Sequence, residues 1–176
     1  FKVNITNTFA MFGDLLHHSY IFESIGNAVM ISAVIIGVLL ILFGKFNSNW
    51  KLYAIISLFL VMVPGFSYVY SIAYMLIPLV AFLNEKKTRK SDYIYLLLFI
   101  LQFGLFIAKK DELFSQFEGS ELALNITTLI ESVVLLLMMA MLYLDGIITT
   151  FKSYKGKKIL HIPANAVASV AMAGIV

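Results

Sequence analysis

The stretch Asn84-Glu-Lys-Lys-Thr-Arg-Lys-Ser-Asp-Tyr93 carries four positive charges and separates two long apolar runs. These runs, residues 66–83 and 93–108, are each close to the roughly 20 apolar residues that a helix needs to cross about 30 Å of hydrocarbon. Loops rich in Lys and Arg stay on the cytoplasmic side of a membrane. The basic stretch therefore predicts two membrane-spanning helices whose ends meet at the cytoplasmic face.

The amino-acid composition also indicates a membrane protein. Hydrophobic residues make up 61% of the chain and charged residues 13%, whereas globular domains average roughly 45 to 50% apolar and about 25% charged residues. The formal charge of +3 is explained by basic residues that flank apolar runs and meet anionic lipid headgroups, so it indicates membrane lipids and no nucleic acid as partners. The absence of cysteine excludes disulfides and thiolate metal sites.

Charge also decides how many apolar segments cross. The candidate spans are residues 25–43, 50–64, 66–83, 93–108 and 126–144. The second is short, because its apolar run covers only 52–63 and reaches a crossing length by adding Trp50 and Lys51 or by thinning the bilayer. Five crossings with the N-terminus outside leave ten Lys and Arg residues inside and three outside, whereas a re-entrant second segment leaves four inside and nine outside.

The sequence therefore predicts an all-α fold, a polytopic transmembrane helix bundle of about five spans with the N-terminus outside and the C-terminal basic segment cytoplasmic. Residues 1–158 form a single helical domain of a multi-pass cell-membrane protein. The tail, residues 159–176, contains His161, Pro163 and Asn165 and receives no role. Because the chain opens at Phe1 outside the membrane, with no preceding span or signal peptide, we expect the upstream part of a longer protein as a further partner.

The predicted outer turn between the second and third spans, Pro64-Gly-Phe-Ser-Tyr-Val-Tyr70, is the first candidate site. Backbone groups freed by Pro and Gly within a membrane are tolerated where protein or water satisfies them, which suits a polar ligand. The candidate substrate-binding residues here are Pro64, Ser67, Tyr68, Tyr70 and Tyr74. The alternative is an aromatic belt at the membrane interface around a tight turn. Pro78 is expected to kink the third span near Tyr74.

Glu131 is the one ionisable residue inside an otherwise apolar span and is a further candidate for substrate binding. It has Thr127 and Thr128 about one turn earlier. The alternative is a protonated or hydrogen-bonded glutamate that only stabilises the bundle.

The segment before the first span places Phe9, Phe12 and Leu16 at helical spacing, so an amphipathic helix over 4–23 is expected along the outer surface. Adjacent histidines point in different directions on a helix, so His17 and His18 do not predict a metal site.

The run from Pro64 to Asn84, which contains a Pro, Ser and aromatic cluster followed by a Leu-Ile-Pro step, resembles a late stretch of polytopic glycosyltransferases of the GT-C superfold, especially glycosyltransferase family 87. The resemblance covers about twenty residues closely and the helix pattern of about 150 residues loosely. It implies that this chain is the C-terminal part of such an enzyme.

The resemblance implies transfer of a sugar from a polyprenyl-phosphate donor to a cell-envelope acceptor at the extracytoplasmic face. The donor is a substrate, and no cofactor is implied. The general base would be a carboxylate of the first outer loop, upstream of this chain. Pro64, Ser67, Tyr68 and Tyr70 would then shape a pocket for the lipid-linked donor or the acceptor.

Two other classes of protein fit the same pattern. In an envelope transport or polymerase component, Glu131 would carry an ion or a proton, and Glu131→Gln would abolish coupled ion movement. In a non-enzymatic membrane subunit, the polar residues would only hold helices together.

Overall fold

The computed structural model describes residues 3–64, 73–85, 92–108 and 121–156, and every regular element within these ranges is helical. The prediction of an all-α fold is confirmed. The six helices of the described ranges are α1 (Ile5–Leu15), α2 (Ser19–Phe43), α3 (Asn49–Met62), α4 (Leu76–Leu83), α5 (Asp92–Ala108) and α6 (Glu121–Gly156).

Two of these helices, α2 and α6, are long and apolar enough to cross a membrane. The 25 residues of α2 rise about 38 Å and the 36 residues of α6 about 54 Å, at 1.5 Å per residue. Both helices extend the predicted spans, 25–43 and 126–144, at one end or both. The added residues mix polar and apolar side chains, and lysines are added only at the end of α6.

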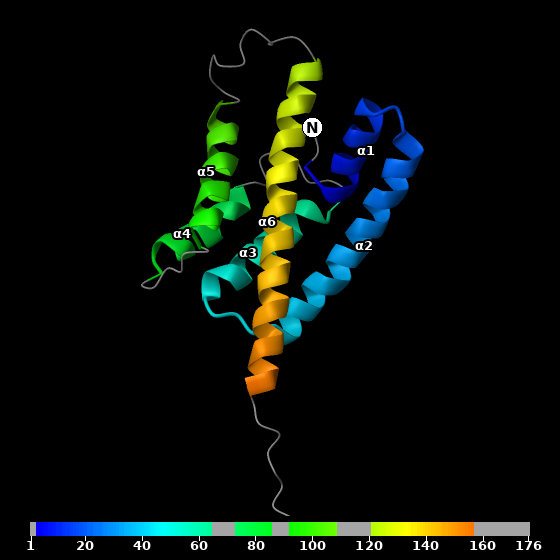
Figure 1. The fold of residues 1–176 in the computed structure, drawn as a ribbon. Helices are drawn as coiled ribbons and strands as arrows, with labels where there is room; N and C mark the ends of the chain where they lie inside the picture. Colours follow the sequence, from blue (N-terminus) through cyan, green and yellow to red (C-terminus); the bar gives the residue numbers. More distant parts are fainter. Residues whose placement is uncertain (1–2, 65–72, 86–91, 109–120, 157–176) are drawn as a thin grey trace, which may run out of the picture.

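The helices are arranged around α6. Figure 1 shows α6 running through the middle of the molecule, with the hairpin of α1 and α2 on one side and α4 and α5 on the other. α3 lies behind α6 in this view and packs against α2, α4 and α6. α5 runs antiparallel to α6 and packs along it.

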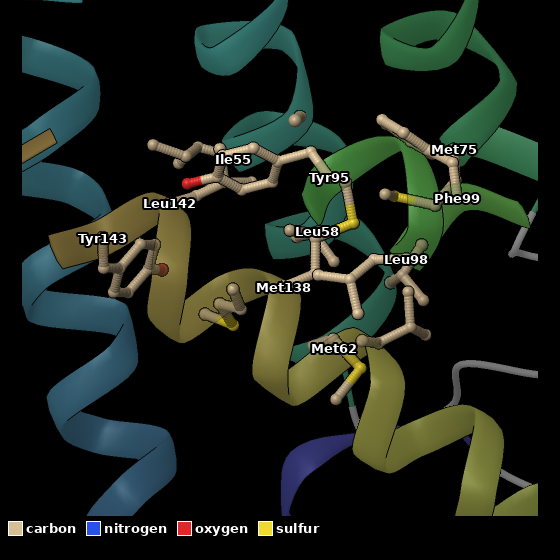
Figure 2. Close-up of a cluster of buried hydrophobic side chains, with 14 of the residues drawn as sticks. Ile55, Leu58, Met62, Met75, Tyr95, Leu98, Phe99, Met138, Leu142 and Tyr143 are labelled. Carbon is tan, nitrogen blue, oxygen red and sulfur yellow. The ribbon is translucent and has the colours of Figure 1, made fainter. Parts of the chain in front are cut away.

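The apolar core lies where α3, α5 and α6 meet. α3 is buried on most sides, as expected for a helix that is apolar around its circumference, and it contributes Ile55, Leu58 and Met62. Figure 2 shows these side chains facing Leu98 and Phe99 of α5 and Met138 and Leu142 of α6, with Met75 from the segment before α4. α3 ends at Met62; Val63 still has right-handed helical φ and ψ, and Pro64 after it has no backbone N–H with which to continue the helical hydrogen bonding.

A close approach of α2 to α6 depends on a glycine. The Tyr143 hydroxyl donates a buried hydrogen bond of 2.9 Å to the carbonyl of Ala33. A Cβ atom at Gly37, one turn along α2, would overlap that hydroxyl and lie 3.1 Å from Cδ2 of Phe59. Glycine is therefore the residue that lets α2 approach both α3 and α6 at this level.

The prediction of one amphipathic surface helix over 4–23 is wrong. Asn4 caps α1, since its Oδ1 accepts a hydrogen bond of 2.7 Å from a backbone N–H of the first turn. The helix then breaks at His17, whose φ of 57° is left-handed, and α2 begins two residues later. α1 folds back onto α2, and its residues Ile5 and Thr8 are fully buried.

The third predicted span also differs from its prediction. Of residues 66–83, those from 66 to 72 lie outside the described ranges, residues 73–75 form a 3-10 turn, and the α-helix begins at Leu76. Pro78 was expected to kink a continuous helix. It lies instead in the first turn of α4, where backbone N–H groups have no partner within the helix and a missing N–H is tolerated.

Candidate functional site

Three charged side chains from three helices meet at one end of the bundle. The Nζ atom of Lys51 lies 2.8 Å from Oδ2 of Asp145 and 3.3 Å from Oδ1 of Asp92. The side chains of Lys51 and Asp92 are each 2% exposed, whereas that of Asp145 is 32% exposed. We refer to these three residues as the ionic cluster.

Local structure explains how each member reaches the cluster. Lys51 follows Trp50 in the first turn of α3, so the start of this helix carries both side chains inward. Asp92 is the first residue of α5, where the positive end of the helix dipole favours a carboxylate. Asp145 follows the apolar run of α6, inside the last third of that helix.

An aromatic shell surrounds the lysine. The Trp50 ring is fully buried and meets the rings of Phe82 and Tyr95 edge-on, at centroid distances of 5.0 and 5.1 Å. Lys51 Nζ lies 5.4 Å from the ring centroids of both Trp50 and Tyr95, within the range of a cation–π interaction. The ammonium group has therefore exchanged water for two carboxylates and two ring systems.

The best-attested role of such a cluster is to fix the register of helices. Burying charges costs several kcal/mol of desolvation for each ion, and this cost is offset only when geometry and counter-charges match. Sliding α5 or α6 by one residue against α3 would move a carboxylate about 1.5 Å along the helix axis and rotate it away from Lys51. The ionic cluster therefore specifies which helix ends lie together.

A second buried polar region lies on the other half of α6. Thr128, Glu131 and Ser132 are fully buried, and their spacing of three and four residues continues into the apolar stripe that contains Leu135 and Met138. Glu131 lies about 21 Å from Asp145 along the helix, by the 1.5 Å rise per residue. The polar region and the ionic cluster are therefore separated by the apolar core.

On α5, Gln102 is also fully buried, on the stripe that includes Tyr95 and Phe99. Neither polar atom of its side-chain amide, nor the hydroxyl of Ser132 on α6, has a hydrogen-bond partner within the part of the chain that the structure describes. Buried polar groups in proteins are usually hydrogen-bonded, so both side chains retain the capacity to bind water or a polar group.

The structure describes three of the six predicted substrate-binding residues. Pro64 is exposed at the end of α3, and Tyr74 is 51% exposed in the 3-10 turn before α4. Glu131 is fully buried on α6. Ser67, Tyr68 and Tyr70 lie outside the described residues, so their role in substrate binding stays a prediction.

Sequence reasoning missed the ionic cluster. Lys51 was expected to be a charge of the inner loop or a helix extension, and Asp92 was included in the basic stretch. A usable signal was present, because Lys51 stands between Trp50 and Leu52 in an apolar segment and Asp145 directly follows an apolar run. Charges in such positions need partners, although a single sequence does not reveal which charges pair.

His17 and His18 are exposed at the turn between α1 and α2. Within the described ranges, no group of three His, Asp or Glu side chains is arranged to hold a metal ion.

Comparison with protein-family models, with curated proteins and with solved structures gives no match for this chain. The function is therefore inferred from the chain's own residues and their geometry.

Proposed function

We propose that this chain is a polytopic unit of a cell-membrane protein, with five crossings, its N-terminal end outside and its basic ends cytoplasmic. The ionic cluster is the observation that carries this proposal. Charge counting puts the starts of α3 and α5 and the last part of α6 on one side of the membrane. Lys51, Asp92 and Asp145 come from those three places and are in contact.

The apolar surface supports a lipid environment. On α2, large apolar side chains such as Ile31, Ile35 and Leu42 are 55 to 66% exposed. On α5, Leu97 and Ile100 are 54 and 59% exposed. Soluble monomers rarely expose contiguous apolar patches of this kind, whereas a helix in a bilayer turns such side chains toward lipid.

The two short helices fit this arrangement because they pack on each other and on longer helices. The 14 residues of α3 rise about 21 Å and the 8 residues of α4 about 12 Å, which is less than the hydrocarbon thickness of about 30 Å. α3 packs on α2 and α6, and α4 packs on α3. Interrupted helices are tolerated within a membrane where protein surrounds their ends.

Within this unit, we propose that the segment from Pro64 to Tyr74 contributes to the donor site of an integral membrane glycosyltransferase, which transfers a sugar from a polyprenyl phosphate to a cell-envelope acceptor. The pattern of residues from Pro64 to Asn84 supports this proposal. Both described ends of the segment are exposed, and Tyr74 offers an aromatic ring and a hydroxyl to a ligand. Such a ring can stack on a sugar or an isoprenoid while its hydroxyl forms a hydrogen bond.

The test is sugar transfer from a radiolabelled polyprenyl-phosphate donor in membranes that contain the protein. We expect Tyr74→Ala to lower the rate about tenfold, because one aromatic contact is worth roughly 1.4 kcal/mol. Tyr93→Ala is the matched control, since Tyr93 is also exposed, at 65%, but lies outside the segment from Pro64 to Tyr74. Equal rates for the two variants would contradict the donor-site proposal.

A further inference from the structure

A groove lies at the end of α6 beyond the ionic cluster. It has a volume of about 560 Å³. Its wall on α6 is made by Asp145, Thr149, Lys152 and Ser153, and its opposite wall by Lys45 and Asn47 of the loop between α2 and α3. We refer to it as the basic groove.

The two walls are joined by hydrogen bonds. The backbone N–H of Lys45 donates to the Thr150 hydroxyl at 2.9 Å, and the Asn47 side-chain amide donates to the Thr149 hydroxyl at 3.4 Å. The loop also needs Gly146, because a Cβ there would lie 2.8 Å from Cε1 of Phe46. Each wall therefore presents one lysine, Lys45 or Lys152, from a fixed backbone position.

The charges around the groove favour an anion with a single negative charge. Asp145 forms part of the wall, but Lys51 lies 2.8 Å from its carboxylate and offsets it. Taken with Asp92, the groove and the ionic cluster contain three lysines and two aspartates, which leaves one positive charge. A phosphodiester has one negative charge and accepts hydrogen bonds from ammonium and hydroxyl groups.

Apolar side chains beside the groove supply a place for hydrocarbon. Ile148 lines the groove and is 50% exposed. On the same helix, Leu144 and Phe151 are 60 and 66% exposed. A ligand that combines a phosphodiester with aliphatic chains satisfies both parts of this surface.

We propose that the basic groove binds the phosphodiester headgroup of an anionic membrane phospholipid. This inference rests on the membrane placement proposed above, but not on sugar transfer. Its success or failure is therefore independent of the glycosyltransferase assay.

The experiment measures binding of short-chain phosphatidylglycerol to the purified protein in neutral detergent, by titration calorimetry. Lys45→Gln/Lys152→Gln is expected to weaken binding about 30-fold, since each lysine near a lipid headgroup contributes to affinity. The backbone N–H that holds the loop is retained in this variant. Lys155→Gln is the matched control, because Lys155 is exposed on the last turn of α6 and does not line the groove; it should change affinity less than about twofold.

Two other ligands separate the alternatives. Short-chain phosphatidylcholine, which has no net charge, is expected to bind more weakly than phosphatidylglycerol. Inorganic phosphate is expected to compete only at far higher concentration, because it lacks the aliphatic part. The proposal is overturned if the wild-type protein does not bind phosphatidylglycerol, if the control variant loses as much affinity as the double variant, or if phosphate binds as tightly as the lipid.

Discussion

At Lys51 an ammonium group is 2% exposed and has carboxylates at 2.8 and 3.3 Å. The cost of removing this cation from water is offset by Asp92, Asp145 and the rings of Trp50 and Tyr95. The dependence is mutual. Without the lysine, two carboxylates would share one buried site and repel each other.

Lys51→Met is therefore expected to destabilise the bundle by roughly 3 to 5 kcal/mol, the typical cost of removing one partner from a buried ion pair. The measurement is the midpoint of thermal unfolding in detergent, with Lys155→Met as the exposed control. Adding Asp145→Leu to the Lys51→Met variant should recover part of the loss, because it leaves a single carboxylate. An unchanged midpoint in Lys51→Met would contradict the buried cluster.

The burial of some charged residues could be predicted from the sequence, whereas that of others could not. Glu131 is recognisable because it interrupts an apolar run, and the structure does bury it completely. Lys51 was not recognisable in the same way, because a charge at the edge of an apolar segment is ordinarily solvated. Its burial is favourable because Asp92 and Asp145 lie beside it, and Asp145, 94 residues further along the chain, is brought there by tertiary structure alone.

Between elements, the packing of α2 against α6 is set by small side chains and one buried hydrogen bond. Gly37 makes room for the Tyr143 hydroxyl, which donates to Ala33 one turn earlier on α2. Small residues at helix interfaces allow this kind of close approach in membranes, where interhelical packing replaces the hydrophobic effect.

Gly37→Ala is expected to lower stability by roughly 1 to 3 kcal/mol, because the added methyl displaces the Tyr143 hydroxyl and overpacks the interface. The thermal midpoint in detergent is again the measurement. Gly104→Ala is the matched control: nothing lies within 4 Å of a Cβ at that position, so the substitution should be neutral or stabilising. In a Tyr143→Phe background, which removes the hydroxyl, Gly37→Ala should cost less, and equal costs in both backgrounds would argue against this contact.

Most helices could be located from hydropathy, but their ends and breaks could not. Long apolar runs predicted α2, α5 and α6, and the structure extends α2 and α6 through polar flanks. The break between α1 and α2 depends on a left-handed conformation at His17. Glycine usually marks such a position, and the sequence has histidine there. Because α4 begins only at Leu76, Pro78 lies in its first turn and does not kink a longer helix. The hydropathy of residues 66–83 gives no sign that a helix begins at Leu76.

For the whole molecule, the distribution of charge and the contacts between helix ends agree. The ionic cluster and the basic groove lie at the same end, where α6 meets the starts of α3 and α5. The turn between α1 and α2 lies toward the opposite end of α2 (Figure 1). The proposed orientation therefore puts the end with the ionic cluster at the cytoplasmic side and the turn between α1 and α2 at the outer side.

The chain has no cysteine, so single cysteines report this orientation without background. Tyr20→Cys, at a position 86% exposed near the start of α2, should react with a membrane-impermeant maleimide added to intact cells. Tyr154→Cys, at a position 55% exposed near the end of α6, should react more than about tenfold less until the membrane is permeabilised. The reverse pattern would invert the proposed topology.

The order of residues in the ionic cluster also has a consequence for biosynthesis. Lys51 leaves the ribosome before either of its carboxylate partners, and Asp145 follows it by 94 residues. Until then the carboxylate partners of Lys51 have not all been synthesised, although its side chain is buried from water in the folded protein. α3 is thus made well before α6, but its position in the bundle is secured only when most of α6 has been synthesised.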